Sequence, residues 1–324
     1  MPTAIEATDE SSRRRGRDVR YWSGRWDQLC SLLPSFELAP FQSGPDLTPN
    51  PYLHSVVRMP LTLAEHPIPV GVVSNSYALV QHADLATKCL EGIRKAGIDP
   101  KLLRCEIGLT PLGEWMNLRV SLPDDFRVPG EKNVDDRVGL RLEAFNSVDR
   151  SSRLVVLFSW LRLVCSNGMT ISETFTELRD VHDKRLTLEP LPEIIGRGLA
   201  TAESDKRRLR QWASTPVASE GIEPWVNKSV SDSWGKKAAC RVFHICRSGQ
   251  DVDLADPFAG GRASEKVVKP AGPVPGAAIP AKTLFDVSQA LSWVATRRND
   301  SEERLLWQQQ IPELVSSLSI YRSR

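Results

Sequence analysis

The sequence lacks the long apolar runs and signal segments that would place it in or across a membrane. No stretch approaches the roughly 18 apolar residues of a membrane-spanning helix. The most apolar run, 154–164, is interrupted by Ser159 and Arg162. The first 25 residues hold no apolar segment of a secretory signal. We therefore expect a soluble, cytoplasmic protein with no membrane partner.

Short motifs for nucleotide, metal and acyl-transfer chemistry are also missing. The sequence has no Walker A loop and no GxGxxG, HExxH or GxSxG motif. Its five histidines do not stand at metal-ligand spacing from one another, and its six cysteines form no CxxC pair. We therefore predict no catalytic residue, no metal ligand and no cofactor, and we favour a non-enzymatic function.

Charge of one sign is not in excess, because 42 Lys and Arg residues face 40 Asp and Glu residues. The balance does not require a nucleic-acid partner. Thirty of the 42 basic residues are arginine, since only 12 are lysine. Arginine suits bidentate contacts with phosphate, although a GC-rich coding sequence produces the same bias.

The composition, with 41% hydrophobic and 25% charged residues, is that of a folded globular protein. Residues 1–50 are expected to form a mobile, arginine-bearing arm and a loop, and residues 51–175 an antiparallel β-rich core. Residues 176–248 are expected to be helical, 249–282 to be a Gly/Pro-rich linker or flap, and 283–324 to form C-terminal helices. The predicted fold class is α+β: an antiparallel β meander with packed helices, followed by a helical C-terminal part.

Alternation of apolar and polar residues, or a continuous apolar run, predicts five strands. They span 55–63, 102–109, 115–122, 137–145 and 153–164. Pro60 is expected to confine the first strand to a sheet edge. Short loops between the later strands fit an antiparallel meander, and the last strand, apolar on both faces, is expected to be central.

Helical spacing of apolar residues predicts the remaining elements. They span 82–96, 188–212, 223–246, 283–297, 301–310 and 312–320. Gly97 marks the end of the first helix. Thr283 and Asp286 are expected to form a capping box at the start of the helix over 283–297.

Two segments are unusually rich in specific polar residues: Val72–Gln81 (VVSNSYALVQ) and Arg162–Met169 (RLVCSNGM). In the second, a strand ends in Asn167-Gly168, a strong turn signal because both residues tolerate positive φ. One interpretation is a tight turn with a buried Cys165. The other is that backbone amides and Asn167 hold a phosphate or a base edge.

These segments resemble a family of phage- and plasmid-encoded proteins known as domain of unknown function 932. The first matches the family's strand-then-Tyr element through Tyr77 and Gln81. The second matches an Arg-x-x-Cys-[Ser/Thr]-Asn-Gly element through Arg162, Cys165, Ser166, Asn167 and Gly168. A C-terminal Trp-Asp-x-x-Asn-Ala-x-Thr helix of the family is matched loosely by Phe285–Ser292. The resemblance covers about residues 50–310 and implies a mobile-element origin and an α+β fold.

A β meander beside a helix is also similar, at the level of the fold, to ring-forming single-strand annealing proteins of recombination. That similarity implies a homo-oligomer that binds single-stranded DNA along a basic groove. The residues permit this independently, because arginines on polar strand faces attract phosphates and a neighbouring ring stacks on bases.

The predicted nucleic-acid contacts fall into three groups. The polar strand faces contribute Arg58, Trp115, Asn117, Arg119, Arg137 and Arg141. The strand end contributes Arg162 and Asn167. The helical part contributes Lys206, Arg207, Arg208, Lys236, Lys237 and Arg241. From 228 to 247 five basic residues face one acid, Asp232. The alternative is that each group is a packing residue or a solvated helix face.

Three functions remain open on the sequence. The favoured one is a nucleic-acid-binding protein of a phage or plasmid, for example an oligomeric factor that anneals or protects single-stranded DNA. The second is a non-catalytic factor that binds a host or element-encoded protein in anti-defence or replication control, since nine tryptophans suit interface hot spots. The third is a metal-dependent nucleic-acid enzyme with Glu143 and Asp135 or Asp136 as its carboxylates.

Overall fold

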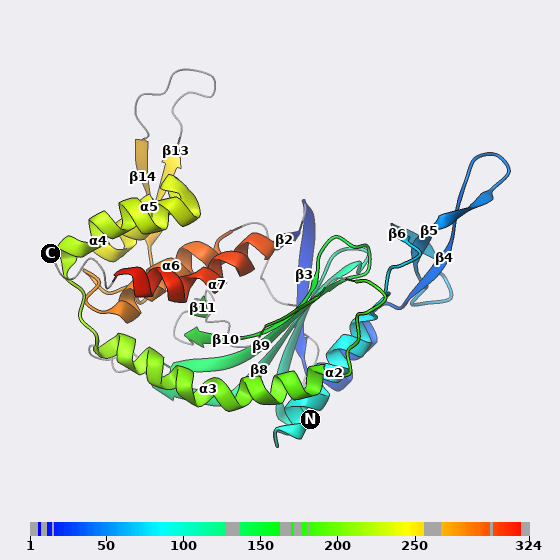
Figure 1. Ribbon diagram of the computed structural model, residues 1–324, viewed down its shortest axis with the longest axis horizontal. Helices are drawn as coiled ribbons and strands as arrows, with labels where there is room; N and C mark the ends of the chain where they lie inside the picture. The colour runs from blue at the N-terminus through cyan, green and yellow to red at the C-terminus, as the bar shows by residue number, and fades with distance from the viewer. Residues whose placement is uncertain are drawn as a thin grey trace.

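The computed structural model has an α+β fold, as the sequence predicts (Figure 1). It describes residues 6–7, 12–14, 16–127, 137–162, 170–171, 177–180, 182–255, 267–298 and 301–318. A nine-stranded antiparallel sheet lies at its centre. A three-stranded sheet projects at one end of the molecule and a two-stranded hairpin at the other (Figure 1).

The large sheet contains the predicted meander. Its strands are β1 (Glu6–Ala7), β2 (Ser12–Arg14), β3 (Arg17–Gly24), β7 (Arg104–Leu109), β8 (Trp115–Arg127), β9 (Arg137–Ser147), β10 (Leu154–Arg162), β11 (Thr170–Ile171) and β12 (Glu177–Asp180). They pair in the order β1-β3-β7-β8-β9-β10-β11, with β2 beside β3 and β12 beside β10. Strands β7 to β10 pair consecutively, which confirms the meander. Strand β10 was expected to be central; it is next to last in the order, with the short strands β11 and β12 on its outer side.

One face of this sheet is apolar and packs against α2 (His82–Lys95) and α3 (Leu191–Ser214) (Figure 1). Met116, Leu118 and Val120 lie on this face and are fully buried, as their alternation predicts. Burying each such side chain contributes about 1.5–3 kcal/mol. The alternation therefore fixes which face of the sheet receives the helices.

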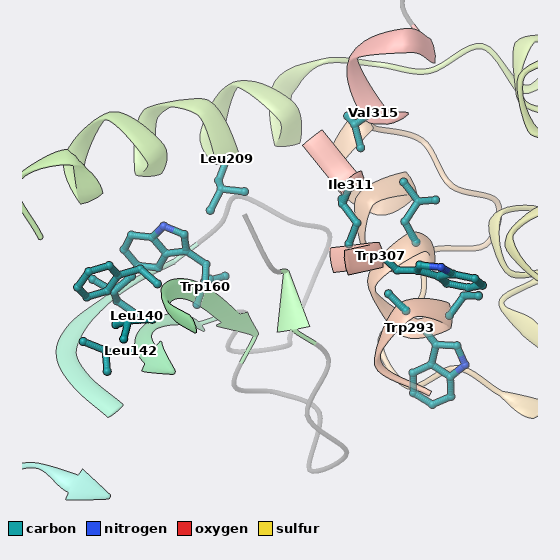
Figure 2. Close-up of a cluster of buried hydrophobic side chains, with 14 of the residues drawn as sticks. Leu140, Leu142, Trp160, Leu209, Trp293, Trp307, Ile311 and Val315 are labelled. Carbon is teal, nitrogen blue, oxygen red and sulfur yellow. The ribbon is translucent and has the colours of Figure 1, made fainter. Parts of the chain in front are cut away.

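The C-terminal helices form a second layer. They are α4 (Ser219–Trp225), a π-helical turn (Val226–Val230), α5 (Ser231–Ser248), α6 (Leu284–Thr296) and α7 (Ser301–Leu318). Figure 2 shows Leu140 and Trp160 of the sheet beside Leu209 of α3, with Trp293 of α6 and Trp307 of α7 across from them. All five belong to one buried cluster, so the sheet and the helical part share a core.

The capping box predicted at the start of α6 is confirmed. The hydroxyl of Thr283 accepts a hydrogen bond from the backbone N–H of Asp286 at 3.2 Å, and the Asp286 carboxylate accepts one from the Thr283 N–H at 2.9 Å. The helix predicted at 82–96 is confirmed as α2, with Gly97 just beyond its end at φ +87°.

The N-terminal 50 residues contain more regular structure than predicted. The segment predicted to be an arm includes β3, which pairs with β7 inside the large sheet. The Pro-rich stretch predicted to be a loop forms β4 (Phe36–Ser43) and the first part of β5 (Thr48–Arg58). Pro40 is tolerated because it lies at a register shift on the outer strand of the small sheet.

Three further boundaries differ from the prediction. The strand expected at 55–63 ends at Arg58, before Pro60, and lies between β4 and β6 (Ile68–Ser74) rather than at an edge. The segment 249–282, predicted to be a Gly/Pro-rich linker or flap, contains a hairpin of β13 (Gln250–Ala255) and β14 (Val267–Pro273). The two helices predicted over 301–320 are one helix, α7, which includes Pro312.

Candidate nucleic-acid interface

The segment 74–82 (SNSYALVQH), which we call the signature segment, connects the three-stranded sheet to the large sheet through side-chain contacts. Tyr77 is 6% exposed, and its hydroxyl donates a hydrogen bond to the backbone carbonyl of Ser147 at 3.0 Å. Its ring stacks on His182 with 5.2 Å between centroids. The tyrosine therefore joins the end of β9 to the small sheet.

The last two residues of the signature segment also hold neighbouring backbone. The Gln81 amide donates to the Phe36 carbonyl at 2.7 Å and accepts from the Phe36 N–H at 3.0 Å, which ties down the start of β4. His82 is fully buried and lies 2.7 Å from the Gly113 carbonyl through Nε2 and 2.9 Å from the Asn146 amide through Nδ1. These partners favour the neutral imidazole of His82, in which Nε2–H donates and Nδ1 accepts. Burial lowers the pKa of His82 to about 4.

We expect Tyr77→Phe to lower the free energy of unfolding by about 1 kcal/mol, because it removes one buried hydrogen bond and leaves the Ser147 carbonyl without its donor. Urea unfolding monitored by circular dichroism measures the change. Tyr52→Phe, at a tyrosine that is 76% exposed, is the matched control and should change the free energy by less than about 0.5 kcal/mol. Equal effects of the two substitutions would contradict the assigned role of Tyr77.

The polar face of the large sheet brings Arg119 between two glutamates. Strand register places Arg119 of β8 opposite Glu106 of β7 on one side and Glu143 of β9 on the other. Its guanidinium lies 3.5 Å from the Glu106 carboxylate, 3.8 Å from that of Glu143 and 4.3 Å from the centroid of the Tyr21 ring. Arg119 is only 6% exposed, so its charge is directed to these partners.

Arg141 lies next to Arg119 on the same polar face. Its Nε donates to Glu143 at 2.9 Å, and its terminal nitrogen contacts the same carboxylate. Burial by itself raises the pKa of Glu143, but the guanidinium groups of Arg141 and Arg119 outweigh burial and the pKa is lowered. Glu143, proposed above as a metal ligand, is thus an ionised counter-ion, while Asp135 and Asp136 lie outside the described residues.

Two further predicted contacts on this face are buried. Trp115 is 2% exposed and packs against Phe145 with 5.9 Å between ring centroids. Asn117 is 1% exposed and accepts a hydrogen bond from the Tyr21 hydroxyl at 3.4 Å. In this structure both side chains act as packing residues, which is the alternative that the sequence left open for Trp115.

The remaining sheet residues do not gather at this place. Arg58 belongs to the small sheet and pairs with Glu65 at 3.1 Å. The side chains of Arg137 and Arg162 lie outside the described part of the chain, as do residues 163–169 with Cys165, Ser166, Asn167 and Gly168. The anion-holding role of that turn stays a prediction.

The basic cluster of the helical part divides between buried and exposed positions. Lys206 of α3 is 7% exposed, and its ammonium lies 5.9 Å from the centroid of Trp160. Arg207 is exposed and Arg208 half-buried. On α5, Arg241 donates through Nε and a terminal nitrogen to Asp251 at 2.8 and 2.6 Å, and Trp293 donates to the same carboxylate at 2.8 Å. Arg241 therefore anchors the β13–β14 hairpin.

The outer side of α5 keeps its positive charge at the surface. Lys236, Lys237 and Arg247 are exposed and His244 is half-buried, and we call these four residues the α5 basic face. No acidic residue occurs between 233 and 250. The opposite side of the helix is buried in the core, so helical spacing directs the face outward.

Sequence reasoning singled out Lys236 and Lys237 and counted Arg247 in the same basic run, but it missed Phe243 and His244 as part of the same surface. The Arg247 guanidinium lies 5.8 Å from the centroid of the Phe243 ring, and His244 meets that ring edge-on at 5.7 Å. The signal that identifies them is spacing, since residues 236, 240, 243 and 247 lie on one stripe of a helix. Lys228, in the π-helical turn, is also exposed.

Metal and membrane sites are not indicated by the described residues. Within them, no three His, Cys, Asp or Glu side chains come together as a metal site requires. No helix in the described ranges combines the length and the apolar character needed to cross a membrane.

Comparison with known proteins supports the family but gives no function. No curated protein and no solved structure matches the chain. A family model described as a domain of unknown function (DUF932) matches residues 69–271, which is 203 of the 324 residues. The match includes the signature segment and α5, and it ends before the Phe285–Ser292 helix. The chain therefore belongs to the family of domain of unknown function 932.

Proposed function

We propose that this protein binds nucleic acid through the α5 basic face. The observation that carries the proposal is the concentration of exposed positive charge on one helix of a chain whose net charge is only +2. The arginines of the large sheet are less suited to this role, because Glu106 and Glu143 already neutralise Arg119 and Arg141.

The geometry of α5 suits a phosphate backbone. From Lys236 to Arg247 the helix rises about 16 Å, so its cations can follow several successive phosphates. Phe243 is half-buried, and its ring lies beside Arg247 with 5.8 Å between the guanidinium and the ring centroid. A ring close to positive charge favours single strands, whose bases are free to stack. We therefore propose single-stranded DNA as the preferred ligand.

Fluorescence anisotropy of a labelled 30-nucleotide single strand, compared with the matching duplex, tests the proposal. If Lys236, Lys237 and Arg247 each neutralise one phosphate, the plot of log K against log salt has a slope of about −2. Affinity should then fall about 20-fold between 50 and 200 mM salt. Binding that is absent, or that does not change with salt, would overturn the proposal.

A charge-removing variant locates the surface. Lys236→Gln/Lys237→Gln is expected to reduce affinity about 10–100-fold at 50 mM salt and to make the salt slope shallower by about 1.4. Lys101→Gln/Lys184→Gln, at two exposed lysines outside α5, is the matched control and should bind like the unmodified protein. Equal losses in both variants would show a diffuse electrostatic attraction instead of an α5 site.

A further inference from the structure

Helix α5 is interrupted at Gly235, directly before the two lysines of the α5 basic face. Gly235 has φ +82° and ψ 163°, whereas the other residues of α5 are helical. Glycine is the residue that adopts this combination of angles without strain. The position is exposed, and a Cβ atom placed there would meet no heavy atom within 4 Å. The glycine is therefore required by the backbone conformation and not by a lack of space.

Both sides of the interruption are held in place by the rest of the protein. Before it, the Trp234 ring stacks on Trp307 of α7 with 4.7 Å between centroids, and its Nε1 donates to the Gln310 side chain at 2.7 Å. After it, the Arg241–Asp251 ion pair joins α5 to the β13–β14 hairpin. The interruption is therefore a fixed feature between two anchored segments and not the frayed end of a helix.

The interruption separates the one acidic residue of this region from the first lysine that follows it. Asp232 is the only acid from 228 to 247, and it stands four positions before Lys236. In an uninterrupted helix this spacing places the two side chains next to each other, in the order that favours an ion pair. Both residues are exposed, yet among the described residues no carboxylate pairs with the Lys236 ammonium. The positive charge of Lys236 is therefore not neutralised by Asp232.

We propose that Gly235 is a positioning residue for the α5 basic face, because its conformation keeps Asp232 away from Lys236 and leaves that lysine to bind a phosphate. The inference rests on the proposed function for its ligand, but not for the geometry of the helix. An ion pair with Asp232 would compete with the phosphate for the ammonium, and the carboxylate would also repel the phosphate. Since the net charge of the chain is only +2, the local arrangement of charges determines the attraction.

Replacing Gly235 by alanine tests the proposal, because alanine disfavours the interrupted conformation and favours a continuous helix. Gly235→Ala is expected to bind the labelled 30-nucleotide single strand about two- to threefold more weakly at 50 mM salt, which is the size of effect that one exposed ion pair exerts. Gly196→Ala in α3 is the matched control, since Gly196 also lies inside a helix and has no heavy atom within 4 Å of a Cβ position, but lacks a positive φ. It should bind like the unmodified protein.

Asp232→Asn distinguishes the proposed role from a general disturbance of the helix. It is expected to raise the affinity of the Gly235→Ala protein by about two- to threefold, back to that of the unmodified protein. In the unmodified protein, where Asp232 does not pair with Lys236, the same substitution should change the affinity by less than about 1.5-fold. A purely structural role of Gly235 does not produce this coupling between positions 232 and 235.

Acetylation of Lys236 by a limiting amount of an N-hydroxysuccinimide ester, followed by mass spectrometry, measures the pairing without DNA. An ammonium that is paired with a carboxylate releases its proton less readily, and only the uncharged amine reacts. The rate at Lys236 is expected to be equal in the unmodified protein and in Asp232→Asn, about twofold slower in Gly235→Ala, and restored in the double variant. Circular dichroism checks that each variant is folded.

Either of two results would overturn the proposal. One is that Gly235→Ala binds DNA as tightly as Gly196→Ala does, and the other is that Lys236 is acetylated faster in Asp232→Asn than in the unmodified protein. The second comparison leaves Gly235 unchanged, so it tests the proposal even where the alanine variant does not fold. If the unmodified protein does not bind DNA, the proposed function fails, while acetylation still reports whether Gly235 separates the two charges.

Discussion

Replacing Glu143 by alanine is expected to lower the free energy of unfolding by about 3–5 kcal/mol. Glu143 is 6% exposed, and its carboxylate pairs with Arg141 and, like that of Glu106, with Arg119. Without it, two guanidinium groups in a buried environment each lose a carboxylate partner. Removing one partner of a buried ion pair is destabilising because the other charge stays buried, where neither water nor an opposite charge compensates it.

Urea unfolding at pH 7 measures this effect, and Glu106→Ala is its matched control. The Glu106 side chain is 29% exposed, so water can replace it and its removal should cost about 1 kcal/mol or less. Glu143→Gln keeps an acceptor for Arg141 and should fall between the two. A cost below about 1 kcal/mol for Glu143→Ala would show that the polar face is solvated instead of packed.

Acidification from pH 7 to pH 4 is expected to destabilise the protein by about 3 kcal/mol through His82 alone. Burial lowers the pKa of His82 from 6.5 to about 4 in the folded state. Between these values the unfolded chain binds the proton and the folded chain does not. The neutral His82 side chain therefore makes its full contribution to the free energy of unfolding above pH 6.5, and this contribution is lost as the pH falls toward 4.

His82→Gln isolates this contribution from that of the carboxylates. A glutamine amide can donate to the Gly113 carbonyl and accept from Asn146, as the neutral imidazole does, but it does not titrate. Unfolding free energies of both proteins are measured from pH 4 to 8. The difference between the two curves should be constant above pH 6.5 and change by about 3 kcal/mol below it. Parallel curves would contradict a buried neutral histidine.

The sequence by itself determined the elements whose periodicity is strong. Alternation in 115–122 and 137–145 predicted β8 and β9. Helical spacing predicted α2 and α6, and the Thr283–Asp286 pair predicted the start of α6. These features are local, because strand alternation, helix spacing and capping act within a few residues of the chain.

Only the tertiary structure decided what the polar residues do. The sequence places Arg119, Arg141 and Glu143 on polar strand faces, but register is a non-local property, and it is register that turns these side chains into a buried ion-pair network. The segment that forms β4 was predicted to be part of a loop, yet the outer position of β4 in the small sheet tolerates Pro40.

At the candidate sites too, the sequence indicates which residues are polar or charged, and the tertiary structure determines their partners and exposure. The basic residues of α5 are visible in the sequence, but which of them are exposed depends on packing: Asp251 engages Arg241, while Lys236, Lys237 and Arg247 stay at the surface. Likewise, the polar residues of the signature segment are visible as a motif, but their partners Phe36, Gly113 and Asn146 come from distant parts of the chain. Local patterns therefore fixed the elements, and contacts between distant elements determined which charges remain exposed for binding.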